Sequence, residues 1–395
     1  MRLRQLIVIS CATFAVSACS TLPPLLAPAP DGNESDRAIG SQPAPPPRDL
    51  KVRWSTTLTT NATRPAVIGT RAFFTDGSII TAVDLASGHV VWSRDFNASG
   101  VRFGPPIASQ GRVLTAASNA GLGGTYSFDV DGSHSGNLGF HQFVGEIAAD
   151  GPLTATVGGS YGSGTPVLTT LSFAGNWFLS FGSGPGSGPI TITGGRAFMT
   201  VNGSVSGFDP NAPCVPVPPP FPFAYCNRTW GKSIAGAQIA SNAGRGKVAV
   251  ASTNGTISVL DGATGTVQFT TVNAGTALSA TTHSGQGRLF TTGADGLMRV
   301  YDSAGCNAPP CAPLWTGTVG SASSVAPTVS NARVYVATND GRLVVFATTG
   351  CASSACEPLA VGDSGTGLPA TSKPMIVNGV VLETFGNQIY AFKTA

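Results

Sequence analysis

Short runs of β-branched and aromatic residues alternate with polar residues along most of the chain after residue 50. Glycine, asparagine, aspartate and serine separate these runs, and no long stretch has the i, i+3, i+4, i+7 apolar spacing of a helix. An alternation of period two puts one side of a strand in a core and the other side toward solvent. The pattern therefore predicts many short strands joined by tight turns, which is an all-β fold.

One two-stranded unit recurs along the chain. In Arg71–Asp84, two apolar runs flank an Asp-Gly pair, and glycine supplies the positive φ angle that a tight hairpin turn needs. The turn glycines lie 41 to 52 residues apart between Gly203 and Gly386. Eight repeats of about 44 residues would suit the four-stranded blades of a β-propeller. Besides 71–84, we expect hairpins at residues 196–209, 247–261, 288–302, 333–346 and 380–392, with weaker copies at 111–129 and 153–173.

The two ends of the repeat region complement each other. The last repeat stops at Ala395 directly after its third strand, whereas Val52–Leu58 resembles a fourth strand with no hairpin before it. An N-terminal strand that completes the last blade would remove two exposed sheet edges. We therefore predict an eight-bladed β-propeller over residues 51–395, closed by its N-terminal strand, with Trp54 beside Gln388–Lys393. A tandem array of β-sandwiches is the alternative, but it does not explain the complementary ends.

Residues 1–18 have the pattern of an export signal. Two arginines precede an apolar core at residues 6–16, which is too short to span a bilayer, and Val-Ser-Ala then leads to Cys19. This end resembles a bacterial lipobox, which implies cleavage before Cys19 and attachment of acyl chains, palmitate among them, to that cysteine. An ordinary signal peptide cut after Ala18 is the alternative. Residues 19–50 are rich in proline, alanine and serine, which favours an extended tether between lipid and folded body.

Charge narrows the range of partners. The formal net charge is +3, charged residues make up 10% of the chain, and no run of lysine or arginine follows the first four residues. A nucleic-acid-binding surface needs clustered cations, so we expect no nucleic-acid partner. The residue after the lipobox cysteine is Ser20. In lipoproteins that resemble this one, aspartate there implies retention in the inner membrane, so Ser20 favours the outer membrane in a source with two membranes.

Six cysteines remain after the signal and the lipobox. They form three local pairs, each between the third and fourth strands of its repeat, and an exported protein meets conditions that permit disulfides. A zinc site is the alternative, but the four histidines do not cluster with these cysteines and no Cys-x-x-Cys pair exists. The predicted disulfides join Cys214 to Cys226, Cys306 to Cys311 and Cys351 to Cys356.

The segment from Ala82 to Trp92, with Asp84 and Gly88, resembles the signature of quinoprotein-type (PQQ-like) propeller repeats, and Leu260–Val267 follows the same pattern. The resemblance implies the propeller fold and says little about activity. Quinone-dependent dehydrogenases of this kind carry adjacent cysteines over the quinone and acidic ligands for calcium. This chain has no adjacent cysteines, only 19 acidic residues, and no nucleophile elbow, His-Glu-x-x-His or phosphate loop. We therefore predict no enzyme activity, no cofactor, and no catalytic or metal-binding residues.

The repeats and the lipobox together resemble the lipoprotein propeller subunit of the outer-membrane β-barrel assembly machinery. That resemblance implies a monomeric, non-catalytic scaffold, held by lipid at the periplasmic side of the outer membrane, that binds envelope or outer-membrane proteins. The three cysteine loops, the long tether and the Pro-rich insert at residues 213–222 depart from the usual pattern of that family. A relative with a different partner is therefore an equal alternative. A quinone-dependent dehydrogenase-like propeller and a carbohydrate- or cell-wall-binding propeller are the others.

Overall fold

The structure, a computed structural model, describes residues 50–394 apart from short stretches at 97–99, 110, 120–121, 142, 151–152, 160–166, 173–176, 182–190, 194, 202, 210–213, 217–223, 227, 245, 272–278, 284–286 and 331. Every regular element in this part of the chain is a β-strand. Among these residues, no helix is long and apolar enough to span a membrane. The predicted all-β class is confirmed. The predicted signal (1–18), the lipidated Cys19 and most of the tether (19–50) lie outside the described residues.

The described strands form eight sheets, each built on a four-stranded antiparallel meander. In chain order the first four sheets comprise β2 (Ala66–Ile68), β3 (Arg71–Asp76), β4 (Ile79–Asp84) and β5 (Val90–Asp95); β6 (Val101–Ser109), β7 (Arg112–Asn119), β8 (Leu122–Phe128) and β9 (His134–His141); β10 (Phe143–Asp150), β11 (Leu153–Gly159), β12 (Val167–Ser172) and β13 (Trp177–Phe181); and β14 (Thr191–Thr193), β15 (Arg196–Val201), β16 (Ser204–Phe208) and β19 (Trp230–Ser233).

The remaining four sheets repeat this plan. They comprise β20 (Ala237–Asn242), β21 (Lys247–Ser252), β22 (Ile257–Asp261) and β23 (Val267–Thr271); β24 (Ser279–His283), β25 (Arg288–Thr292), β26 (Leu297–Asp302) and β27 (Trp315–Thr318); β28 (Thr328–Ser330), β29 (Arg333–Ala337), β30 (Arg342–Ala347) and β32 (Ala360–Asp363); and β33 (Met375–Val377), β34 (Val380–Phe385), β35 (Gln388–Thr394) and β1 (Leu50–Thr57). Three short strands lie outside the meanders: β17 (Cys214–Pro216), β18 (Ala224–Cys226) and β31 (Ala355–Cys356).

The predicted hairpins are the second and third strands of the sheets. In the first of them, Gly77 joins β3 to β4 with a φ of +57°, a backbone conformation that residues with a Cβ rarely adopt. The side chain of Asp76, next to this glycine, accepts a hydrogen bond of 2.8 Å from the backbone N–H of Thr60 and another from the Thr60 hydroxyl. The Asp-Gly pair therefore both makes the turn and ties it to the segment that leads into the sheet.

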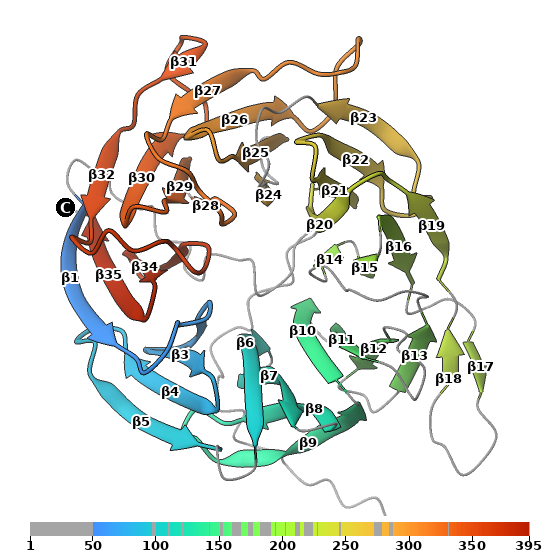
Figure 1. Cartoon of the computed structure of the whole chain (residues 1–395), viewed down its shortest axis with the longest axis vertical. Helices are drawn as coiled ribbons and strands as arrows, with labels where there is room; N and C mark the ends of the chain where they lie inside the picture. Colours follow the sequence, from blue (N-terminus) through green and yellow to red (C-terminus); the bar gives the residue numbers. More distant parts are fainter. Residues whose placement is uncertain are drawn as a thin grey trace, which may run out of the picture.

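The sheets stand around a common axis, with the first strand of each sheet nearest the centre and the fourth strand at the rim (Figure 1). The apolar core lies in layers between neighbouring sheets. One layer joins Trp54 and Leu382 of the last sheet to Phe74 of the first, and the next joins Phe385 of the last sheet to Tyr335 of the sheet before it. The strands between these layers are therefore buried on both faces, as β34 and, apart from the half-buried Arg71, β3 illustrate.

The N-terminal strand pairs antiparallel with the last strand of the chain. Leu50 lies opposite Thr394, Trp54 opposite Ala391 and Thr57 opposite Gln388, and Figure 1 draws β1 along the outer side of β35. Because β33, β34 and β35 supply three strands of this sheet, β1 occupies its fourth position.

Aromatic residues of the fourth strands contact the following sheet. The indole of Trp54 donates to the carbonyl oxygen of Leu85, and the indoles of Trp92 and Trp230 make the same kind of bond to the next sheet along, at distances of 2.9 to 3.1 Å. The turn that receives each ring contains a glycine with positive φ, such as Gly88 beside Trp54. This contact explains why the repeat signature joins a glycine to a tryptophan.

Candidate interaction surface

Two of the three predicted disulfides lie in the described part of the chain. Cys306 is bonded to Cys311 and Cys351 to Cys356, each across five residues, in the loops between the third and fourth strands of adjacent sheets. In both loops the first cysteine is exposed and the second is buried, at 4% exposure for Cys311 and 3% for Cys356. Each disulfide therefore fastens an exposed loop to a residue that packs against the body.

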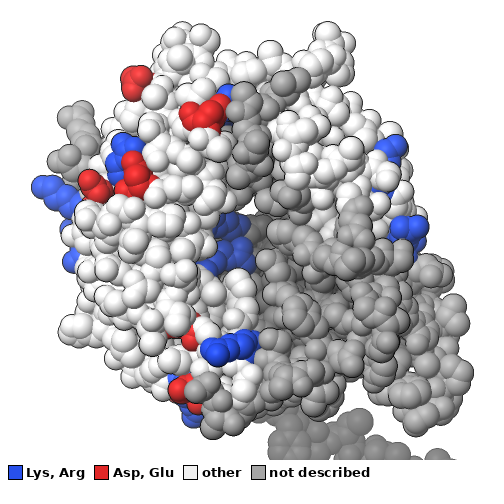
Figure 2. All heavy atoms as spheres, in the orientation of Figure 1, with Lys and Arg blue, Asp and Glu red and all other residues white. Residues whose placement is uncertain are grey.

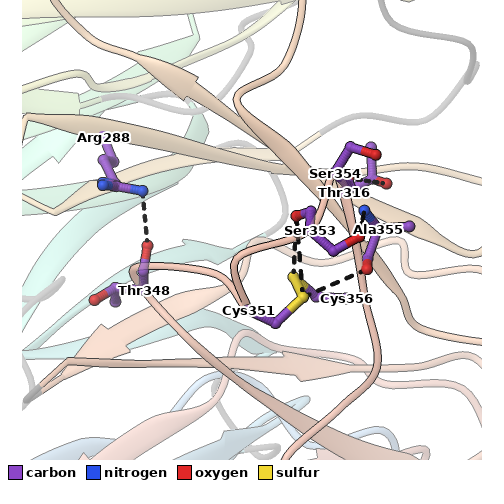
Figure 3. Close-up of a disulfide and its surroundings, with 8 residues drawn as sticks. All are labelled: Arg288, Thr316, Thr348, Cys351, Ser353, Ser354, Ala355 and Cys356. Atoms are coloured by element: carbon purple, nitrogen blue, oxygen red, sulfur yellow. Dashed lines mark hydrogen bonds between the residues drawn. A yellow bond between two sulfur atoms is a disulfide. The ribbon is translucent and has the colours of Figure 1, made fainter.

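These loops contact the outermost strand of the preceding sheet. The strand β31, which contains Cys356, pairs in parallel with β27, and the N–H of Thr316 donates to the carbonyl of Ser354 at 2.8 Å (Figure 3). In the same way Cys311 bridges to Thr271 at the end of β23. The loop of one sheet thus adds a short extra strand to the outer edge of the sheet before it.

The third cysteine loop repeats this arrangement in its backbone. Cys214 and Cys226 lie directly opposite each other in the hairpin of β17 and β18, and β18 pairs in parallel with β13, the outermost strand of the preceding sheet. The side chains of these two cysteines lie outside the described part of the structure, so their disulfide remains a prediction.

Other outer strands have no such cover in the described part of the chain. The strands β32, β1 and β5 belong to three consecutive sheets around the ring, and each is the last strand of its sheet (Figure 1). They, or the residue just before them, expose large apolar residues: Leu359, Val361, Val52, Val90 and Val91, with between 40% and 51% of each residue accessible. We refer to the outer edges of β32, β1 and β5 as the open rim. Exposed apolar groups on edge strands mark it as the candidate interaction surface.

The acidic residues of the turns serve the fold. The carboxylate of Asp84 accepts hydrogen bonds from the N–H of Ala86 and from the N–H and hydroxyl of Ser87, at 2.8 to 3.1 Å. The bonds from Ser87 lower the pKa of Asp84. Asp261 makes the equivalent bonds with Thr264, which lower its pKa in turn. These aspartates cap the turn that receives the aromatic ring, which accounts for the Asp of the repeat signature.

Glu383 is an acidic residue that lies outside the turns. It lies on β34 with none of its surface exposed, and burial raises its pKa well above the usual value. One carboxyl oxygen accepts the N–H of Thr384 at 2.9 Å, and the other has no hydrogen-bond partner. In the sequence Glu383 was recognisable only as an acid outside a turn, because its burial depends on packing between sheets.

The described residues do not assemble a metal site, since no three His, Cys, Asp or Glu side chains among them lie close enough to hold an ion. Side chains of His134, His141 and Glu146, which the sequence leaves without a structural role, are outside the described part. On the face drawn in Figure 2 most of the described surface carries no charge, and basic side chains gather in the hollow near the centre.

Comparison with known proteins agrees with this geometry. Residues 253–353 match the sequence profile of a family described as outer membrane protein assembly factor BamB, with PQQ-like repeats. No curated protein sequence matches the chain.

Solved structures share the fold at low sequence identity. BamB from Moraxella catarrhalis superimposes with a TM-score of 0.58 at 12% identity, over 87% of this chain and 99% of that one. The quinohemoprotein alcohol dehydrogenase from Comamonas testosteroni superimposes with a TM-score of 0.60 at 13% identity, over 93% of this chain and 81% of that one. The C-terminal WD40 domain of Sif2 superimposes with a TM-score of 0.63 at 12% identity, over 88% of this chain and 99% of that one. The matched repeat and the shared fold together show that the chain is a β-propeller of PQQ-like repeats that resembles BamB.

Proposed function

We propose that this protein is a non-catalytic scaffold, held at the outer membrane by a lipid on Cys19, that binds envelope proteins during outer-membrane protein assembly. The observation that carries the proposal is the match of residues 253–353 to the BamB profile, in a chain whose whole described body has the propeller fold. The lipobox pattern before Cys19 and the tether over residues 19–50 support a periplasmic body on a lipid anchor.

The scaffold consists of one rigid ring of eight blades, closed by the N-terminal strand. The pairing of β1 with β35 supports this closure, because it joins the first and last described strands in one sheet. A closed ring suits a scaffold, since it presents loops and outer edges at fixed positions. The ring acts as a monomer and needs no cofactor.

The similarity to quinohemoprotein dehydrogenases raises the question of catalysis. The residues present do not fit a calcium-bound quinone: the chain has no adjacent cysteines, and its described residues contain no cluster of metal-binding side chains. Among the residues that the structure describes, the one fully buried carboxyl is that of Glu383, whose single hydrogen-bond partner is the backbone of Thr384. We therefore assign no reaction step to this chain.

Crosslinking in intact cells, followed by purification of the full-length protein, tests the proposal. Recovery of outer-membrane assembly components is the expected result. The variant Cys19→Ser is the matched control, because it retains the propeller but cannot carry the lipid, and it should lose those components together with its membrane association. Recovery of no envelope protein, or dye reduction after addition of pyrroloquinoline quinone and calcium, would contradict the scaffold.

A further inference from the structure

The outer edges of the sheets differ in whether the chain itself covers them. An edge strand has backbone N–H and C=O groups without a sheet partner, and such edges readily pair with other extended chains. Here β18 covers β13, β31 covers β27, and the Thr271–Cys311 bridge covers the end of β23. Each cover is an extended segment running parallel to the edge that it pairs with. The molecule therefore contains its own example of what binds an outer edge of this ring.

Among the described residues, the open rim has the same kind of edge without such a covering segment. On β5 the first two residues, Val90 and Val91, are both exposed, at 51% and 44%, so two large apolar side chains point to solvent next to the edge. On the covered outer strand β27 the first residue, Trp315, is 4% exposed, although Leu314 directly before it is 51% exposed. A strand added to β5 would shield the two valines and pair with the outward backbone groups at the same time.

The hydrogen-bonding pattern of β5 identifies those outward groups. The N–H of Phe96 donates to the carbonyl of Ser78 at 3.0 Å, so this N–H faces the β4 side of the strand. Backbone N–H and C=O groups alternate in direction along a strand. The N–H of Arg94 therefore also faces β4, whereas the N–H and C=O of Ser93 face outward. The outward donor and acceptor of Ser93, next to two exposed valines, form a short binding edge.

We infer that the outer edge of β5 binds an extended, strand-forming segment of a partner protein as an added strand, in the way that β31 binds β27. This inference rests on the proposed scaffold function and names the kind of partner segment. The side chains of Arg94 on β5, and of Lys51 and Arg53 on β1, are exposed along the open rim. The one acidic residue of β5, Asp95, is also exposed, but its carboxylate already accepts a hydrogen bond from the Ser78 hydroxyl at 2.7 Å. The preferred segment alternates apolar and polar residues and carries acidic residues at its ends. Recognition of this kind uses main-chain hydrogen bonds for affinity and side chains for selectivity.

Amide hydrogen exchange tests the edge directly. The probe is a short peptide of alternating valine and threonine with a glutamate at each end, titrated into the full-length protein. We expect exchange at Ser93 to slow by roughly tenfold at saturation. Exchange at Thr316, whose edge β31 already covers, should not change. Unchanged exchange at Ser93 with saturating peptide would overturn the inference.

Substitutions at the edge separate binding from folding. Ser93→Pro removes the outward N–H at a position where an edge strand tolerates proline. Ser93→Ala is the matched control, because it removes only the hydroxyl that contacts Thr81. Measured by the fluorescence anisotropy of the labelled peptide, affinity should fall by roughly tenfold with proline and stay near the native value with alanine. Equal affinity of the two variants would contradict the inference.

A second variant keeps the test valid should proline disturb folding. Val91→Lys retains every backbone N–H, and lysine on an edge opposes strand addition. The same substitution also removes one of the two exposed valines that an added strand would shield. The peptide should therefore bind Val91→Lys more weakly than the native chain. Native affinity in Val91→Lys would mean that the peptide binds elsewhere.

The same variants distinguish failure of the edge from failure of the scaffold. In the cell-crosslinking experiment, Ser93→Pro should recover fewer envelope proteins than Ser93→Ala. If the proline variant recovers them at the native level, the β5 edge is not the binding site although the scaffold stands. If the native chain recovers none, the scaffold itself fails, and the peptide experiment still reports whether β5 accepts a strand.

Discussion

The indole nitrogen of Trp54, on the N-terminal strand, donates a hydrogen bond of 3.0 Å to the carbonyl oxygen of Leu85 in the first sheet. This bond crosses the junction between the sheet in which β1 pairs with β35 and the first sheet. Trp315 occupies the same place in its own sheet and packs against Gly350, but its indole nitrogen is buried without a hydrogen-bond partner. The two tryptophans therefore share a packing role and differ in one hydrogen bond.

That difference predicts unequal effects of the same substitution. Trp54→Phe should reduce the free energy of unfolding by about 1–3 kcal/mol more than Trp315→Phe, because it also leaves the Leu85 carbonyl without its donor. In Trp315→Phe the lost N–H had no partner, so only ring area is lost. Urea unfolding of both variants measures the difference. Equal losses would mean that the Trp54 hydrogen bond adds nothing to the junction.

The turn beneath Trp54 should not accept a side chain. Gly88 has a φ of +76°, and a Cβ at this position would lie 2.6 Å from the indole ring. Gly88→Ala should therefore cost more than the roughly 1 kcal/mol of an unfavourable φ alone. Gly69→Ala is the matched control, because Gly69 has a φ of +60° and a Cβ there would meet no atom within 4 Å. Unfolding free energies that fall equally in both variants would exclude the steric contribution.

Local sequence patterns were sufficient to find the hairpins and the two disulfides that the structure describes. An Asp-Gly pair such as Asp76-Gly77 encodes its turn within two residues, and Cys351 and Cys356 are close enough along the chain to bond without knowledge of the fold. The propeller class follows from the number and spacing of these local signals.

The strands added to the outer edges of the sheets, and the burial of the Glu383 carboxyl, could not be predicted in this way. Thr316 and Ser354 come from different repeats, 38 residues apart, and no local pattern marks them as partners. Glu383 sits among residues typical of a buried strand, and its burial follows from the neighbouring sheet packing over it. Contacts between sheets depend on how the repeats stack, which a single repeat does not encode.

The disulfide at Cys351–Cys356 should hold β31 on β27. The double variant Cys351→Ala/Cys356→Ala should lose on the order of 2 kcal/mol of stability, as expected for a short loop. The amide of Thr316, which donates to Ser354 in the loop, should exchange faster with solvent. The double variant Cys306→Ala/Cys311→Ala removes a disulfide that closes a loop of equal length, and it should leave the exchange rate of the Thr316 amide unchanged. Unaltered exchange at Thr316 in the first variant would show that the disulfide does not hold the cover.

Glu383 should make stability depend on pH. Its carboxyl is buried, so the fold favours the protonated form and the pKa is raised in the folded state. The folded chain then holds this proton more tightly than the unfolded chain, whose glutamate titrates near about 4.3. Stability from this group is complete below that pH and falls as pH rises toward the folded pKa, by up to about 1.4 kcal/mol per pH unit.

Glu383→Gln should remove this slope, because the amide stays neutral at every pH and still offers an oxygen to the N–H of Thr384. Urea unfolding at several pH values between about 4 and 8 measures the effect as the difference between variant and native chain. The turn aspartates, whose lowered pKa values give the opposite slope at acidic pH, cancel in that difference. The free energy of unfolding of Glu383→Gln should therefore increase relative to that of the native chain as pH rises. A difference that stays constant with pH would show that Glu383 keeps an ordinary pKa in the folded state and is not held in its neutral form by burial.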